Sequence, residues 1–180
     1  MNKQLAEKIG RGVLWVSLAF AGQVSVLRSW GRERDNDALR GLLASPVPRA
    51  SIYFGKLMSG LVILSLVCFV LVPLVGLFFH LEFRDLPMLT LLLLLGTLGF
   101  VSAGTLFGAL TVRSSAREVV LSLIVFPLVT PALLGGVVAT RALMGGAPFE
   151  EIAVWLGVLA VFDSIFLLSG WLLFDALLTD

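Results

Sequence analysis

Five long stretches with few or no charged residues place the strongest constraint on how this chain can fold. An α-helix needs about 20 mostly apolar residues to cross the roughly 30 Å hydrocarbon core of a bilayer. The five stretches are Gly12–Leu27, Leu57–Phe79, Leu86–Val112, Val119–Thr140 and Ile152–Leu178. Their apolar residues are continuous, whereas the strands of a transmembrane β-barrel alternate apolar and polar residues. The sequence therefore predicts an all-α, polytopic integral membrane protein with five transmembrane helices.

The composition supports one membrane domain over residues 1–180. Hydrophobic residues make up 58% of the chain and charged residues 14%, against about 45–50% and about 25% in soluble proteins. A net charge of +1 gives no reason to expect a nucleic-acid partner. The single cysteine, Cys68, excludes an intrachain disulfide and a paired-thiol metal site.

Basic residues in the short connections predict the orientation of the chain. Residues 28–56 carry six Lys and Arg and residues 113–118 carry two, whereas the connections at 80–85 and 141–151 carry one each. The positive-inside rule then places residues 28–56, residues 113–118 and the C-terminus in the cytoplasm. The N-terminus falls outside despite Lys3, Lys8 and Arg11. One more helix upstream would return the N-terminus to the cytoplasm.

Residues 28–56 form the only sizeable polar segment, and we expect them to contain a short amphipathic helix. The mixed charges of Arg32–Asp37 suit a helix start. Ala38, Leu39, Leu42 and Leu43 follow at helical spacing, and the prolines in Ser45–Pro48 end the pattern. Two interpretations stay open at this point. The helix either rests among lipid headgroups or docks a cytoplasmic partner that transmits force.

The chain lacks a phosphate-binding loop, so we expect it not to hydrolyse ATP itself. Gly55-Lys56 is followed by Leu57 where the motif requires Ser or Thr. Ala50 also stands where the motif requires its leading glycine. Energy for any transport would come from another polypeptide.

Two ionisable residues are candidates for chemistry. Asp163 lies deep in the last apolar stretch, where a charge is costly and by default suggests a function. Asp175 is about 18 Å further along that helix, too far away to share a proton with it. His80 is the only histidine and a weak candidate ligand for haem iron, with an ordinary interfacial role as the alternative. We expect no metal site and no catalytic residue.

Small residues and prolines predict how two of the helices pack. Gly96, Gly99, Gly104 and Gly108 give the third stretch a face on which another helix, or another subunit, can approach closely. Pro127 and Pro131 free backbone carbonyls and predict a kink or hinge in the fourth stretch.

Aromatic residues near the ends of the spans have an ordinary explanation in the membrane interface. Trp30 and Tyr53 fit an aromatic belt, as do whichever of Trp15, Trp155 and Trp171 lie near a span end. This interpretation requires no stacking on a porphyrin.

Two segments resemble known permeases. Glu33–Lys56, with Leu42-Leu43 and Ser45-Pro46-Val47-Pro48-Arg49, is similar to the loop through which ABC-2-type exporter permeases couple to their ATPase. A second block resembles the haem exporter protein B family more specifically. It comprises Leu95–Phe100, Gly104–Phe107, Arg117–Val119, Phe126–Leu128 and Pro131.

The second resemblance implies a permease subunit in the bacterial inner membrane that serves cytochrome c maturation. It implies haem as cargo with no resident cofactor, ATP bound on a separate ATPase subunit, a second copy of the chain, a haem-handling membrane protein and a haem chaperone. Family members have six spans, so the first helix of the family is missing here. A permease for a lipid, glycan or drug, or a scaffold that transports nothing, remains an alternative. The residues expected to couple to the ATPase are Glu33, Asp37, Leu39, Leu42, Leu43, Pro46, Arg49, Arg113, Arg117 and Glu118.

Overall fold

The protein is a bundle of long antiparallel helices. The computed structural model describes residues 3–35, 48–81, 83, 85–111 and 117–179, and it describes side chains for residues 5–31, 48, 50–81, 83, 85–111 and 119–173. The helices in the described ranges are α1 (Lys3–Asp35), α3 (Arg49–Phe79), α4 (Leu86–Thr111), α5 (Arg117–Met144) and α6 (Phe149–Thr179).

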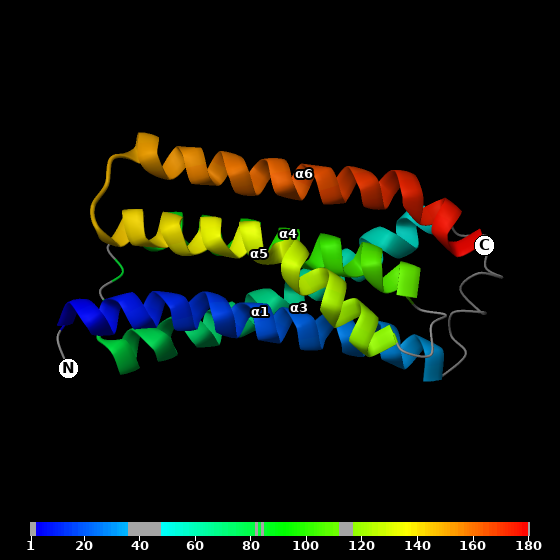
Figure 1. Ribbon diagram of the computed structural model, residues 1–180, viewed down its shortest axis with the longest axis horizontal. Coiled ribbons are helices and arrows are strands. Elements are labelled where there is room, and N and C mark those ends of the chain that lie inside the picture. Colours follow the sequence, from blue (N-terminus) through cyan, green and yellow to red (C-terminus); the bar gives the residue numbers. More distant parts are fainter. Residues whose placement is uncertain (1–2, 36–47, 82, 84, 112–116, 180) are drawn as a thin grey trace.

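Each of the five helices is long and apolar enough to cross a membrane, which confirms the predicted fold class. Successive helices run in opposite directions, so the two termini lie at opposite ends of the bundle (Figure 1). The N-terminal end carries the connections around His80 and Gly146. At the C-terminal end α1 and α4 finish and α3 and α5 begin (Figure 1).

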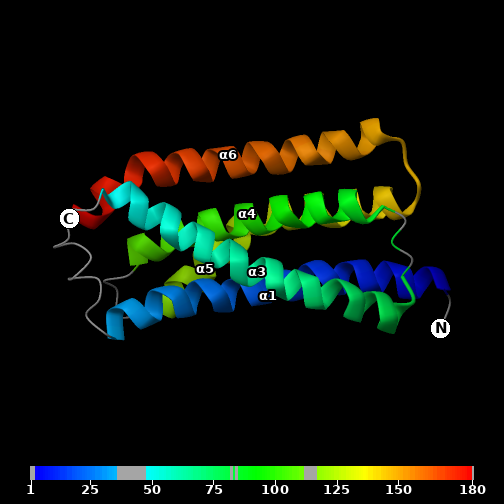
Figure 2. The ribbon, with the colours of Figure 1, turned by 180° about the vertical axis from the view of Figure 1, so that it is seen from behind.

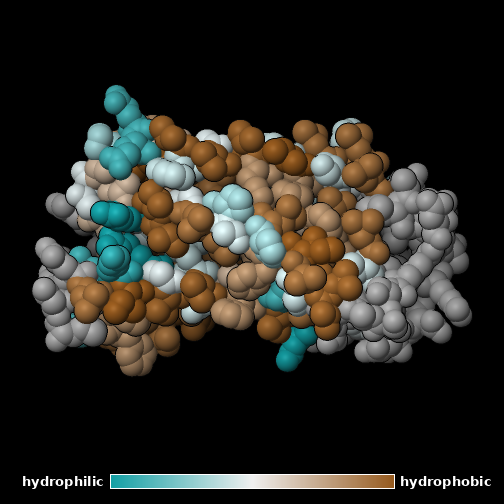
Figure 3. Space-filling view, viewed as in Figure 1, coloured by the Kyte–Doolittle hydropathy of each residue, from teal (hydrophilic) through white to brown (hydrophobic). Residues whose placement is uncertain are grey.

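The surface of the bundle suits a lipid environment. Large apolar side chains are exposed along the helices, among them Phe69, Leu77, Leu123 and Val161. Hydrophilic residues gather at the N-terminal end, over the start of α6 and the end of α5 (Figure 3). This is the distribution expected of a protein whose sides face hydrocarbon and whose ends face water.

Helix α4 is the central element. It packs against α1, α3, α5 and α6, and 16 of its 26 residues are buried. Helix α3 crosses the bundle obliquely, from α6 at the C-terminal end to α1 at the N-terminal end (Figure 2). Helix α5 contains Pro127 and Pro131 and changes direction near its middle (Figure 1).

Glycines bring α1 and α4 together. The space that a side chain would take at Gly96 is filled by the Trp15 ring, and the space at Gly108 is filled by the Trp30 ring. In return, Gly22 of α1 receives the ring of Phe100 from α4. Because hydrocarbon provides no hydrophobic force between helices, this close fit of large and small residues is what holds two transmembrane helices together.

The aromatic-belt interpretation of two residues is wrong. Trp30 and Tyr53 are 1% and 0% exposed, so neither side chain faces lipid as a belt residue does. Trp30 fills the space at Gly108, and Tyr53 fills the space at Gly170 of α6. Their position near the span ends suggested an aromatic belt. Both rings instead pack inside the bundle, in the space beside glycines of neighbouring helices.

The predicted helix start at Arg32–Asp37 is also wrong where the structure describes it. Helix α1 continues without a break to Asp35, so Arg32–Asp35 are its last residues. Arg and Glu are good helix formers, and no proline interrupts the run. The first span is correspondingly longer than predicted, at Leu5–Gly31.

Candidate functional site

The C-terminal end of the bundle is where the sequence places the coupling residues. Glu33, Arg49, Arg117 and Glu118 belong to the ends of α1, α3 and α5. These helix ends lie at one end of the bundle, so the two connections expected in the cytoplasm start from the same surface (Figure 1). Outside the described residues lie Asp37, Leu39, Leu42, Leu43, Pro46 and Arg113, together with the amphipathic stripe.

Two buried contacts tie this end to the bundle core. The Lys56 ammonium lies 3.8 Å from the centre of the Trp30 ring, and Lys56 itself is only 8% exposed. Because Trp30 fills the space at Gly108, this contact joins α1, α3 and α4. The Tyr53 hydroxyl donates to the carbonyl oxygen of Phe166 at 3.2 Å, which joins α3 to α6.

Sequence reasoning treated Lys56 only as one of the basic residues of the loop. A lysine two turns inside an apolar helix indicates a buried cation that needs a partner such as an aromatic ring, but no local pattern says which ring it meets. Residues on both sides of the segment between α1 and α3 are therefore packed against α4 and α6.

The middle of α5 presents polar groups on an exposed face. Pro127 and Pro131 are exposed, and each lacks the N–H that would bond the carbonyl four residues earlier. The carbonyl oxygens of Leu123 and Pro127 therefore lose their helical donors. In hydrocarbon, a backbone carbonyl without a hydrogen-bond donor has a free-energy cost of roughly several kcal/mol. Such a face is therefore normally covered by protein or lines a water-filled cavity.

A polar pair lies beside this face. The Gln23 side-chain nitrogen donates to the Ser122 hydroxyl at 2.9 Å, which links α1 to α5. The other Gln23 side-chain atom, Oε1, is buried and has no hydrogen-bond partner among the described residues. A groove of about 570 Å³ opens here between the two helices, lined by Leu27, Val119, Ser122 and Leu123.

Asp163 is buried on the side of α6 that faces α4. It is 3% exposed, and neither carboxyl oxygen has a hydrogen-bond partner among the described residues. Its Oδ1 occupies the space beside Gly99, with the Phe162 ring close by. The Ser102 hydroxyl donates to the Gly99 carbonyl oxygen at 3.1 Å. This carboxyl group therefore makes no bond within the described chain that would explain its presence.

The other predicted residues have clear positions. Gly96, Gly104 and Gly108 each receive a side chain from α1, so side chains of this chain cover the small-residue face. His80 is exposed and ends α3 in the left-handed conformation, at φ 51°, with its backbone N–H bonded to the Gly76 carbonyl. Among the described residues, no cluster of three His, Cys, Asp or Glu could hold a metal ion.

Comparison with known proteins identifies the family that this chain resembles. The family model described as "CcmB protein" matches residues 2–170. Heme exporter protein B of Pseudomonas aeruginosa is 29% identical over 158 residues, which is 88% of this chain and 71% of the relative. The proteins of the same name from Paracoccus denitrificans and Rhodobacter capsulatus are 29% and 28% identical, over 86% and 87% of this chain and 71% of each relative.

Proposed function

The chain belongs to the CcmB protein family, and on that premise we propose that it is the permease subunit of an ABC-type complex that exports haem for cytochrome c maturation. The observation that carries the proposal is the family match over residues 2–170, on a bundle of five helices that can each cross a membrane. The name shared by the curated relatives, heme exporter protein B, supports haem as the cargo.

We propose that a separate ATPase subunit drives the complex through the segment between α1 and α3. Support comes from the helix ends on both sides of that segment. Trp30 precedes it and Lys56 follows it, and the contact between them, with Trp30 against Gly108, joins three helices. A push on the segment would therefore move α1, α3 and α4 together, as a coupling element requires.

We propose that two copies of the chain form the permease and that they meet along α5. The support is the exposed polar centre of α5, where Pro127 and Pro131 leave carbonyls without helical donors. A second copy related by a twofold axis would cover this face with the same surface. The groove beside Ser122 extends the same surface toward α1.

We propose that the complex lies in the bacterial inner membrane, with residues 28–56 and the C-terminus in the cytoplasm. The distribution of Lys and Arg over the connections supports this orientation. A haem-handling membrane protein and a haem chaperone complete the assembly in this proposal, and ATP is bound by the partner subunit.

Purification of the membrane complex through a tag on this chain tests the proposal. We expect an ATPase subunit to co-purify, and deletion of the chain to abolish c-type cytochromes on a haem-stained gel. We also expect the isolated chain to hold no stoichiometric haem. Normal c-type cytochromes after deletion, or accumulation of a lipid or glycan precursor in their place, would contradict haem export.

Two substitutions separate a coupled permease from a scaffold. We expect Leu39→Asp combined with Leu42→Asp to abolish the stimulation of ATPase activity while the subunits still co-purify. The matched control is Arg40→Lys, which changes the same segment and keeps its charge. Loss of assembly in the double variant, or ATPase activity that this chain never stimulates, would identify a scaffold.

A further inference from the structure

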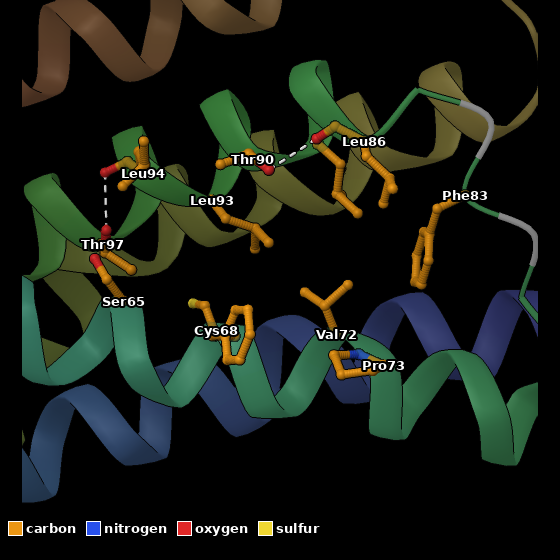
Figure 4. A pocket seen from close by; sticks show the side chains of 12 residues that line it. Ser65, Cys68, Val72, Pro73, Phe83, Leu86, Thr90, Leu93, Leu94 and Thr97 are labelled. Atoms are coloured by element: carbon orange, nitrogen blue, oxygen red, sulfur yellow. Dashed lines mark hydrogen bonds between the residues drawn. The ribbon is translucent and has the colours of Figure 1, made fainter.

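A cleft between α3 and α4 opens where the two helices separate. They touch near the middle of the bundle, where Val101 fills the space at Gly60. Toward the N-terminal end α3 leans away to α1, where Phe79 fills the space at Gly10. The separation leaves a cavity of about 620 Å³ between the helices (Figure 4).

The walls of the cleft are almost entirely apolar. Cys68 and Val72 of α3 face Leu93 of α4 across it, and Phe83 closes the N-terminal end (Figure 4). The hydroxyl groups of the two threonines in the lining already donate hydrogen bonds to backbone carbonyls of α4. Thr90 donates to the Leu86 carbonyl and Thr97 to the Leu94 carbonyl, both at 2.8 Å. Apart from the Ser65 hydroxyl and the Cys68 thiol, the lining therefore offers an occupant mainly apolar contacts.

The depth of the cleft matches one leaflet of a bilayer. Its lining on α4 runs from Leu86 to Thr97, and this stretch of helix is about 16 Å long. Half of the hydrocarbon core is about 15 Å thick. The cleft therefore begins at the membrane surface of the N-terminal end and stops near the midplane.

The shape of the cleft favours a lipid over a transmembrane helix. A transmembrane helix runs through both leaflets, whereas the cleft extends through one. The acyl chain of a lipid occupies one leaflet, as the cleft does. Phe69 and Leu94 on the rim are exposed, so the cleft is open to lipid at the side.

We propose that this cleft binds a fatty-acyl chain of a membrane lipid, drawn from the leaflet at the N-terminal end of the bundle. The occupant fills a space that would otherwise be an empty apolar cavity and holds α3 at its oblique angle to α4. The proposal goes beyond haem export and does not depend on it, because it concerns a lipid bound to the side of the subunit.

Photoreactive lipid tests the proposal on the whole membrane complex. Phosphatidylethanolamine carrying a diazirine on its acyl chain is mixed into bilayers of phosphatidylethanolamine and phosphatidylglycerol, and labelled residues are mapped by mass spectrometry. We expect cleft residues to be labelled about fivefold more than the exposed α6 residue Val161, a ratio that corresponds to preferential binding. Moving the diazirine from near the headgroup to the chain end should shift the label from Phe83 toward Thr97.

A substitution pair on α3 provides a second readout. Val72→Trp places a large ring in the cleft, and Val70→Trp places the same ring on the exposed surface of the same helix. We expect Val72→Trp to reduce cleft labelling about fivefold and Val70→Trp to leave it unchanged. The shift of label with diazirine depth requires no variant, so it tests the proposal even if Val72→Trp fails to fold.

Three outcomes would overturn the proposal. The first is labelling of the cleft no stronger than that of Val161, with no dependence on diazirine depth. The second is a partner-subunit peptide cross-linked at Cys68, which would mean that protein fills the cleft. The third is displacement of the label by zinc protoporphyrin but not by unlabelled phosphatidylethanolamine, which would identify a porphyrin site. None of these results bears on whether deletion of the chain abolishes c-type cytochromes.

Discussion

Trp15 and Thr140 form a buried hydrogen bond that joins helices distant in sequence. The indole Nε1 of Trp15 donates to the Thr140 hydroxyl at 3.0 Å, and the Trp15 ring fills the spaces at Gly96 and Gly136. One side chain of α1 therefore contacts both α4 and α5. The Thr140 hydroxyl in turn donates to the Gly136 carbonyl at 2.8 Å, so both polar groups are satisfied within the apolar core.

Thr140→Val should weaken the bundle by leaving the Trp15 N–H without an acceptor. We expect a loss of about 1 kcal/mol in the free energy of unfolding, because polar contacts between transmembrane helices are worth roughly 0.6 to 1.7 kcal/mol. Thermal unfolding in detergent measures it. The control is Ser164→Ala, since that exposed hydroxyl donates within its own helix, α6, to the Ala160 carbonyl. Equal losses in the two variants would contradict a role for the contact between helices.

Gly170→Ala should destabilise the protein because its new methyl group would overlap the Tyr53 ring. We expect a cost of about 1–3 kcal/mol, as for overpacking of a well-filled core. Gly157→Ala is the matched control on the same helix, because a methyl group there meets no atom within 4 Å. It should be neutral or stabilising by up to about 1 kcal/mol, through helix propensity. Equal unfolding temperatures for the two variants would show that Tyr53 moves aside freely.

Asp163→Val should leave stability unchanged or raise it. The carboxyl group is buried without a hydrogen-bond partner among the described residues, so its removal deletes a desolvated polar group and no bond. We expect a change between zero and about +1 kcal/mol in the free energy of unfolding. Thr140→Val provides the contrast, because it removes a buried polar group that is bonded. A loss above about 2 kcal/mol for Asp163→Val would mean that the carboxyl has a structural partner.

A cysteine at position 130 should cross-link two copies of the chain. Cys68 is the only natural cysteine, so Cys68→Ser provides a background without thiols. In it, Thr130→Cys lies on the exposed face of α5 and, with a short bis-maleimide in native membranes, we expect a band of twice the chain mass. Val161→Cys on the exposed face of α6 is the control. The α5 interface would be wrong if position 161 cross-linked as well as position 130.

The spans were predictable because each depends only on the residues of its own segment. Hydrophobicity and length alone decide whether a segment crosses hydrocarbon, and the stretch Leu86–Val112 corresponds closely to α4. The stretch Leu57–Phe79 ends with α3, but α3 begins eight residues earlier, at Arg49, within the segment predicted as a loop. The first stretch was less predictable. Ser17, Gln23 and Ser25 lower its hydropathy, and the structure buries Gln23 against Ser122 of α5.

The candidate sites were predictable only in part. Asp163 could be identified from sequence, because an acid within an apolar run is conspicuous on its own. The Lys56–Trp30 contact and the α3–α4 cleft could not be identified. The contact requires two helix ends to meet, and the cleft requires two helices to diverge. Neither the meeting of the helix ends nor the divergence of the helices can be predicted from one short segment of sequence.

The sequence by itself determined that the chain is a helical membrane protein, where its spans lie and which family it resembles, because these depend on local hydrophobicity and short motifs. Only the tertiary structure decided that Trp30 and Tyr53 belong to the core, and which glycine receives which side chain. The physical reason is that lipid is as apolar as the helix surfaces. Helices in it are therefore paired by the fit between large and small residues on distant segments, and that fit exists only once the segments are side by side.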